Sequence, residues 1–569
     1  MFRRILKNMG RLACLFVVGL LTFGYLASGL KDERPPAKVD PKVSIVSASS
    51  KSSPAIVSVK LENAEGSQDC VEQLDNAFER RWADDSSDVA PPADWTTVCR
   101  RLSLAMAGSG MSLEEIRELE LLDTDQRVKS HLEKLLRNPR FHDYWGERFT
   151  RVFVGTEDGP FITFRRRRFR HWLSDAIAQN RPYDQLVRNL VTAQGLWTDR
   201  PEVNFLTVTV GTNEEGQPDP IRLAGRTARA FLGMRIDCLQ CHDDFLGNVS
   251  LGSSDNLRGG QQTDFHSLAA FYSTARLNGL QGIRQESHPY EYRFLNDDET
   301  STVEPKVPFA PELMPTEGQP RERLAAWLVH PENKQSARAI VNRVWALMFG
   351  RPLTDGVDNI PLDAIVHPAL DLLASDFVDH GYDLRRLIRI IVASRPFKLA
   401  SAADFEVTER HEKQWSVFPL TRLRPEQVAG SVIQSARVKT VDRESSLLIQ
   451  LMKYGSSNDF VSQYGDSGQD EFIQGNVTIT QRLVMLNGEL VDGHSGNNTV
   501  FNAGAHIMMF AKNDEAAIEA AYLCVLNRYP DDEERSAFAT KLGEAKNREA
   551  VMTDIYWVLL NSSEMTWNH

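Results

Sequence analysis

Residues 113–136 read LEEIRELELLDTDQRVKSHLEKLL and decide the fold class of this chain. Apolar side chains recur at every third or fourth position from Leu113 to Leu122 and again from Val128 to Leu136. This spacing places them on one face of an α-helix. Asn138-Pro139 ends the second element, because the residue before a proline disfavours helical dihedral angles. The stretch therefore predicts two consecutive amphipathic helices.

Helical spacing continues over most of the chain. It recurs from Trp145 to Phe153, from Trp172 to Leu190 and, after Pro320, in stripes that reach Leu560. Alternation typical of a strand is scarce, and residues Phe205–Val210 are its best candidate. We therefore expect a mainly α protein.

Composition along the chain divides it into regions. Residues 31–68 have few large apolar side chains and predict a disordered spacer. Residues 279–320 carry several prolines and many acids, which interrupt helices and predict a linker. We expect two helical domains, over residues 69–278 and 321–569.

The N-terminal residues 1–30 predict export. Arg3, Arg4, Lys7 and Arg11 precede an apolar run over residues 12–30, and this order orients a segment with its positive end inside. The run is long enough to span a membrane, yet Ala27-Ser28-Gly29 would suit a signal peptidase. The segment is thus a signal peptide or an inner-membrane anchor, and the rest is expected in the periplasm or at the cell surface.

Net charge and cysteine content exclude two further classes. The 569 residues carry a formal charge of −12, which disfavours nucleic acid as a partner. Six cysteines are too few for a disulfide scaffold. In an oxidising compartment, Cys70 and Cys99 could still pair.

The sequence Cys238-Leu239-Gln240-Cys241-His242 is the one sharp chemical motif. Two thiols at this spacing reach the two vinyl groups of a haem, and the following histidine ligates its iron. The motif therefore predicts one c-type haem, held by Cys238, Cys241 and His242. The same CxxC pair could instead form a disulfide, exchange electrons as a dithiol, or bind zinc together with the histidine.

A sixth iron ligand would decide the chemistry of such a haem. His266 is the nearest downstream histidine, and Met234 and Met348 are the thioether candidates. His266 is our candidate for a second metal ligand. Two protein ligands favour electron transfer, whereas a vacant position favours chemistry on a small molecule.

Other polar residues allow both a functional and a structural interpretation. Arg165–Arg168 and Arg170 form a dense basic run, either a solvated helix face or a docking patch for an acidic redox partner or a polyanionic glycan. Asn342-Arg343 could lie at a site or form a buried ion pair. Gly465–Gly468 (GDSG) resembles a serine-protease segment but is more typical of a solvated turn.

Several motifs in fixed order resemble a known two-domain family. The first half resembles the cytochrome-like domain of planctomycetes known as domain of unknown function 1549, and the second half resembles its companion, the planctomycete-specific domain 1553. The motifs of the first half are Arg100–Leu104, Asn138–Phe141, Arg181–Val187 and Phe231–Gly233. Those of the second are Ala325–Leu328, Pro331–Asn333, Asn342–Trp345, Phe349–Arg351, His367-Pro368 and Leu560–Glu564.

The resemblance implies an exported protein with a cytochrome-type CxxCH, and no established activity. Relatives usually continue the motif with a His-Pro pair, where this chain has Asp243-Asp244-Phe245-Leu246. Our first hypothesis is an extracytoplasmic haem protein with a redox role. The alternatives are a surface interaction module with a Cys238–Cys241 disulfide, and an exported enzyme acting on surface polysaccharide.

Overall fold

The computed structural model describes residues 65–569 of the chain, apart from residues 157–158, 212–215, 254–255, 296, 364, 444, 446–456, 467, 469–471, 473–477, 489, 492 and 494–501. The predicted N-terminal signal or anchor segment and nearly all of the predicted spacer lie outside these residues. No described helix is both long and apolar enough to cross a membrane.

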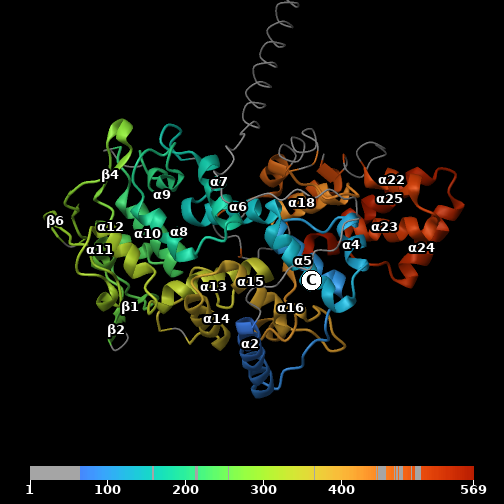
Figure 1. Cartoon of the computed structure of the whole chain (residues 1–569), viewed down its shortest axis with the longest axis horizontal. Coiled ribbons are helices and arrows are strands. Elements are labelled where there is room, and N and C mark those ends of the chain that lie inside the picture. The colour runs from blue at the N-terminus through green and yellow to red at the C-terminus, as the bar shows by residue number, and fades with distance from the viewer. Residues whose placement is uncertain are drawn as a thin grey trace, which may run out of the picture. The chain divides into compact units, whose positions relative to one another are not determined.

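The described residues are mainly helical, which confirms the predicted fold class (Figure 1). The first half contains α2 Glu65–Asp84, α3 Trp95–Ala107, α4 Leu113–Glu120, α5 Thr124–Arg137, α6 Pro139–Val154, α7 Arg166–Ala178, α8 Tyr183–Thr192, α9 Asn204–Thr207, α10 Pro220–Leu232 and α11 Gln262–Ala270. The second half contains α12 Pro320–Leu328, α13 Lys334–Phe349, α14 Pro368–Asp379, α15 Leu384–Ala393, α16 Arg395–Lys398, α17 Glu409–Lys413, α18 Pro425–Ser435, α20 Ile479–Asn487, α22 Ala503–Phe510, α23 Asp514–Val525, α24 Asp532–Glu544 and α25 Arg548–Leu560.

The described strands form only two-stranded antiparallel pairs. These pairs are β1 Ser250–Ser253 with β2 Asn256–Gly259, β3 Ala275–Leu277 with β4 Ile283–Gln285, β5 Glu291–Tyr292 with β6 Ser301–Thr302, and β7 Thr421–Arg422 with β8 Trp567–Asn568. Short 3₁₀ turns are η1 Pro201–Val203, η2 Asp237–Gln240, η3 Gly279–Gln281, η4 Pro311–Leu313 and η5 Glu564–Thr566.

Helix boundaries follow local sequence signals. Ser112 and Glu115 form a capping box at the start of α4, in which each side chain bonds the other residue's backbone N–H. Asn138 caps α6, and Pro139 occupies its first turn, where a missing N–H costs nothing. The break between α5 and α6 thus lies at Asn138-Pro139, as the sequence predicted.

Two possibilities raised by the sequence are not found among the described residues. Residues Phe205–Val210 form the helical turn α9 and its continuation rather than a strand. All six side chains are buried, so the polar threonines do not mark a solvated strand face. Cys70 and Cys99 are both unpaired thiols: Cys70 lies beside Asp376, whereas Cys99 packs with Met111 and its neighbours.

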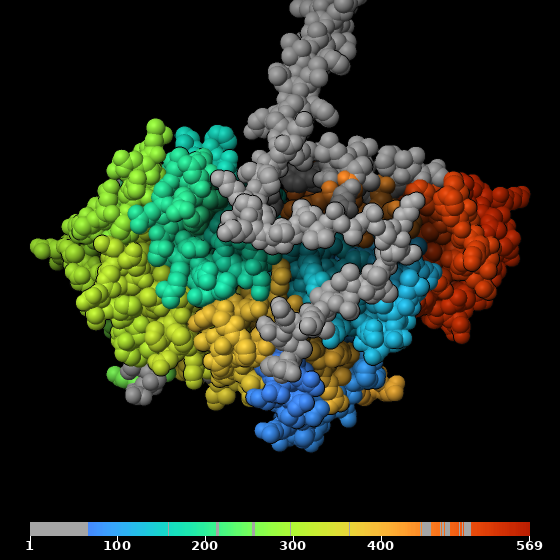
Figure 2. All heavy atoms as spheres, viewed as in Figure 1, coloured from blue at the N-terminus to red at the C-terminus, as the bar shows by residue number. Residues whose placement is uncertain are grey.

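Segments far apart in the sequence pack together. Asn63–His569 form one compact unit, in which α2 lies against α14 and α15. Figure 2 shows the blue atoms of α2 directly against gold atoms of the second half. Arg101 of α3 donates to the backbone oxygens of His569, Phe397 and Leu399, and this clamps the C-terminal residues onto α3. Burial would be costly for this guanidinium without such acceptors.

A paired-charge joint connects the first and second halves. We use this name for Tyr144 and Arg148 of α6 with Arg424 and Glu426 at the start of α18. The Glu426 carboxylate lies 2.7 Å from Arg148 Nη1 and 3.0 Å from Arg424 Nε, and Arg424 also donates to the Tyr144 hydroxyl. Burial would raise the pKa of Glu426, but Arg148 and Arg424 outweigh it and lower that pKa.

Candidate functional site: the CxxCH loop and an arginine-lined cavity

The CxxCH residues form an exposed loop after α10. Gly233 ends that helix in the left-handed region, with φ of 59°, and η2 then turns the chain through Cys238. The Cys238 carbonyl accepts from the backbone N–H of Cys241 and of His242, at 3.1 and 3.3 Å. Leu239 is buried beneath the loop, whereas Cys238, Cys241 and His242 are exposed. The structure therefore brings the three predicted cofactor-binding residues together on one accessible turn.

Three side chains hold the loop through a single carbonyl group. The backbone carbonyl oxygen of Gln240 accepts from His266 Nε2 at 3.0 Å, from Gln262 Nε2 at 3.0 Å and from the Tyr292 hydroxyl at 3.3 Å. His266 is completely buried, and its ring stacks on Tyr292 with centroids 3.5 Å apart. These contacts fix the backbone between the two cysteines.

His266 has no nitrogen left for a metal in this arrangement. A carbonyl oxygen only accepts, so Nε2 carries the proton, and Nδ1 can then accept from the Tyr290 hydroxyl at 2.9 Å. Burial lowers the pKa of His266 and favours this neutral ring. The residue proposed from sequence as a second metal ligand thus lies beneath the loop as a positioning group.

His242 presents the opposite arrangement. Its Nδ1 lies 2.7 Å from the Asp243 carbonyl oxygen, which assigns the proton to Nδ1. Nε2 has no hydrogen-bond partner among the described residues. A neutral imidazole with one nitrogen donating to a carbonyl and the other open has the form that ligates metals. Phe245 and Leu246 follow shortly after His242 and are 81% and 85% exposed, so they add apolar surface to the loop. The Phe245 ring stacks beside the His242 ring.

The thiols do not resemble an activated dithiol. Cys238 and Cys241 are both unpaired. Desolvation, with help from the carboxylates of Asp244 and Asp237, raises the pKa of Cys238, whereas thiol–disulfide exchange uses a lowered pKa. Zinc has no support either, because the described His, Cys, Asp and Glu side chains do not converge in any group of three that could hold a metal.

The two aspartates that follow the motif, Asp243 and Asp244, organise the backbone. Asp243 accepts from the backbone N–H of Gln262 at the start of α11, at 2.7 Å. Asp244 accepts from the N–H groups of Leu246 and Val249, which closes the turn after the motif. The departure from the family pattern thus lies in the support of the loop, outside Cys238, Cys241 and His242.

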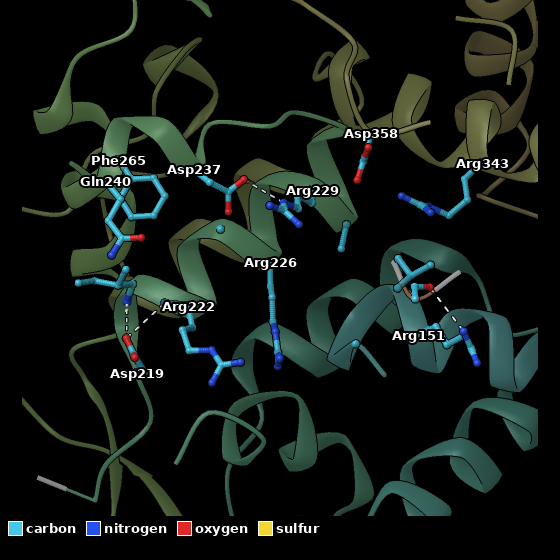
Figure 3. Close-up of a pocket in the computed structure, with 16 residues that line it drawn as sticks. Arg151, Asp219, Arg222, Arg226, Arg229, Asp237, Gln240, Phe265, Arg343 and Asp358 are labelled. Carbon is cyan, nitrogen blue, oxygen red and sulfur yellow. Dashed lines mark hydrogen bonds and ion pairs between the residues drawn. The ribbon is translucent and has the colours of Figure 1, made fainter. Parts of the chain in front are cut away.

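An arginine-lined cavity opens beside the loop. We use this name for a cavity of about 290 Å³ to which Asp237 and Gln240 of the loop contribute (Figure 3). Its charged lining consists of five arginines and three aspartates: Arg151, Arg222, Arg226, Arg229, Arg343, Asp219, Asp237 and Asp358. These residues come from α6, from α10 and the segments next to it, from α13 and from the segment after α13. The lining therefore has a formal excess of two positive charges.

Gly233 allows α13 to approach this cavity. A Cβ atom there would lie 3.1 Å from Ala339 Cβ and 3.2 Å from Ile360 Cδ1. The Gly233 carbonyl also accepts from the N–H of Ile360 at 2.8 Å. This close contact holds the C-terminal end of α10 against α13, which carries Arg343.

The other residues singled out from sequence separate into two groups. Asn342 is structural, because its amide bonds Thr354 and Leu353. Arg343 lines the cavity and makes no ion pair or hydrogen bond with any described residue, which rules out the ion pair considered from sequence within this part of the chain. In the GDSG segment, Asp466 pairs with Arg151, and Ser467 lies outside the described residues.

The basic run at α7 is divided between ion pairs and solvent. Arg166 and Arg170 lie 2.8 and 3.9 Å from Glu147, and Arg165 donates to backbone oxygens. Arg167 and Arg168 remain exposed. Sequence reasoning concentrated on this run and missed Arg222, Arg226 and Arg229. Their spacing of four and three positions was the available signal, since it places all three on one helix face.

The fold and the site define a class: helical proteins with an exposed CxxCH loop in the first half and a second half that helps to enclose the adjoining cavity. Matches to family models show which family the chain belongs to. Residues 73–276 match PSCyt2, a protein of unknown function (DUF1549), and residues 320–542 match PSD1, a protein of unknown function (DUF1553). The chain belongs to the family in which these two domains follow one another, as the sequence motifs predicted. No curated protein and no solved structure matches it.

Proposed function

We propose that this chain carries one c-type haem on the CxxCH loop and has a redox role outside the cytoplasm. One observation carries the proposal: both thiols of a CxxCH motif and His242 Nε2 are accessible on a single anchored turn. Covalent attachment needs two free thiols, and ligation needs an unprotonated ring nitrogen.

The surrounding residues fit such a group. Phe245 and Leu246 supply exposed apolar side chains next to the motif, and a porphyrin would cover apolar surface of this kind. His266, Gln262 and Tyr292 would hold the loop through the Gln240 carbonyl and so keep the positions of the two sulfurs fixed. Bound haem supplies one-electron chemistry.

None of the sixth-ligand candidates from sequence presents a donor at the loop. Met234 and Met348 are 4% and 0% exposed and belong to the main hydrophobic core, and both nitrogens of His266 are engaged. A sixth position without one of these side chains would favour chemistry on a small molecule over simple electron transfer.

The proposal includes a location and partners. Residues 12–30 would act as a signal or inner-membrane anchor and place the loop in the periplasm or at the cell surface. The exposed Arg167 and Arg168 would dock an acidic redox partner protein, with a polyanionic glycan as the alternative partner.

The direct test is haem attachment during maturation. The full chain is co-produced with a c-type maturation apparatus, and covalent haem is measured by staining after denaturing electrophoresis and by the reduced absorption spectrum. The wild-type chain should carry haem, and Cys238→Ala/Cys241→Ala should carry none.

Cys99→Ala is the matched control, because Cys99 is a buried thiol far from the motif in the sequence and should leave haem attachment intact. A wild-type chain without haem would contradict the proposal. Thiol labelling before and after reduction would then show whether Cys238 and Cys241 form a disulfide, as the interaction-module alternative requires.

A further inference from the structure

Arg343 is a buried residue that has no counter-charge among the described residues. The residue is 6% exposed, and no described side chain or carbonyl forms an ion pair or hydrogen bond with it. Figure 3 shows its side chain directed from α13 toward α10 across the cavity. Burial of a cation without a counter-charge is costly, and an anion in the cavity would offset that cost.

Two other buried arginines, Arg321 and Arg101, hydrogen-bond to acceptors of the protein. Arg321 bonds the Gln285 side chain and the carbonyls of Val191 and Ala193, and Arg101 bonds three backbone carbonyls. Arg343 differs from both in having only the cavity in front of its donors. A ligand in the cavity would supply the missing acceptor.

The opposite wall of the cavity is also cationic. Arg222, Arg226 and Arg229 project from one face of α10, and Figure 3 shows Arg222 and Arg226 extending from the same side of the helix. Arg151 of α6 adds a fourth guanidinium from a different helix, and this one is paired with Asp466. Planar guanidinium groups from three helices suit the several oxygens of one oxyanion.

The aspartates of the lining do not compete for Arg343. Asp219 accepts from the N–H groups of Ile221 and Arg222 and so caps α10. Asp237 pairs with Arg229 at 2.9 Å, and Asp358 pairs with Arg235 at 2.9 Å. Because Asp219 already occupies the end of α10, recognition of an anion falls to the arginine side chains rather than to the helix N-terminus.

The volume limits the ligand. About 290 Å³ is at the lower end of the range for small-molecule pockets, so the cavity suits a small ligand. We propose that the arginine-lined cavity binds a small oxyanion, a free molecule bearing a phosphate, sulfate or carboxylate group, through Arg343 and the arginines of α10. The site adjoins the CxxCH loop through Asp237 and Gln240 but requires no haem.

Calorimetric titration with inorganic phosphate tests the proposal, using the full chain at constant ionic strength with chloride as the reference. Phosphate should bind the wild-type protein, and Arg343→Gln should weaken binding at least about tenfold, the loss expected for a charge-assisted hydrogen-bonded pair. Arg343→Lys should recover part of the affinity, because it restores the charge but not the planar donors.

Arg321→Gln is the matched control, since it removes a buried arginine whose acceptors are all protein groups. It should lower the thermal midpoint and leave the phosphate affinity unchanged, whereas Arg343→Gln should keep or raise the midpoint without phosphate. A wild-type protein that does not bind phosphate, sulfate or citrate would overturn the proposal, as would an Arg343→Gln protein that binds phosphate normally.

A third arm separates this inference from the haem proposal. The Cys238→Ala/Cys241→Ala protein should bind phosphate as the wild type does, whether or not the wild type carries haem. Binding that appears only in this haem-free variant would assign the cavity to the carboxylates of the haem itself and would overturn a free ligand.

Discussion

Two contacts between the same halves of the molecule use arginine in opposite ways. In the paired-charge joint, Arg148 and Arg424 share the Glu426 carboxylate at 2.7 and 3.0 Å. In the arginine-lined cavity, Arg343 comes from the second half and faces α10 of the first, with no acidic partner among the described residues. Arg148 and Arg151 lie one turn apart on α6, so a single helix serves both places.

The difference separates structural from binding arginines. A buried ion pair that keeps its partners is tolerated, and removal of one partner leaves a costly charge. The joint meets this condition within the protein, whereas Arg343 in the cavity has no such partner among the described residues. The number of arginines alone therefore does not identify a binding site. What identifies one is whether each guanidinium has an acceptor within the protein.

Removal of the shared carboxylate should have the largest effect. Glu426→Gln would remove the carboxylate that Arg148 and Arg424 share, and we expect a loss of about 3–5 kcal/mol in the free energy of unfolding. Urea denaturation followed by circular dichroism would measure it. Glu409→Gln, which removes an exposed partner of Lys413, should leave the urea midpoint unchanged. Equal midpoints for Glu426→Gln and the wild type would show that the joint contributes no stability.

Acid should weaken the joint reversibly. The folded-state pKa of Glu426 is lowered by Arg148 and Arg424 against the opposing effect of burial. The resulting stability is fully present above the unfolded pKa of about 4.3 and is lost as the pH falls through the folded pKa. The urea midpoint should therefore fall below about pH 4 more steeply in the wild type than in Glu426→Gln. Parallel pH profiles would contradict this assignment.

The packing that brings Arg343 to the cavity can be tested at Gly233. Alanine there would have to adopt φ of 59° and contact Ala339 at 3.1 Å, so Gly233→Ala should destabilise the protein by about 2 kcal/mol and weaken phosphate binding. Gly381→Ala is the control, with φ of 71° and nothing within 4 Å of the added carbon. Gly381→Ala should lower the stability only through backbone strain, and it should leave phosphate binding unchanged. Identical phosphate affinities for both variants would show that Gly233 does not position Arg343.

The smallest effect is expected at the cavity edge. Asp237→Asn removes the partner of Arg229, a pair whose side chains are 42% and 34% exposed. The Arg229 guanidinium would lose this carboxylate, and phosphate affinity should rise about threefold, as expected for the loss of a partly exposed ion pair. Titration calorimetry would measure this change. A weaker affinity would mean that Asp237 holds Arg229 in its binding position.

Helices could be predicted where periodicity and end signals agreed. Residues 113–122 and 128–136 correspond to α4 and α5, and Asn138-Pro139 marks the start of α6. Alternation made residues 205–210 the best strand candidate, because it implies one solvated face, yet all six side chains of this segment are buried. There the Asn204 amide bonds the carbonyls of Trp197 and Pro201, a local arrangement that the alternating pattern does not reveal.

The sequence could predict only those parts of the site whose residues are neighbours in the chain. The five residues of the CxxCH motif are contiguous, and their gathering on one turn followed directly. The role of His266 depends on Tyr290 and on a carbonyl 26 positions away, and the cavity depends on helices more than a hundred residues apart. Arg343 has no partner among the described residues where α13 packs on α10, and no spacing within α13 could show this.

The measurement closest to the central claim is the intact mass of the mature protein, purified after co-production with a c-type maturation apparatus. We predict a mass that exceeds the processed polypeptide by one haem, with the increment absent from Cys238→Ala/Cys241→Ala. A mass equal to that of the polypeptide alone, or lower by two hydrogens through a Cys238–Cys241 disulfide, would contradict the assignment of the loop to a haem.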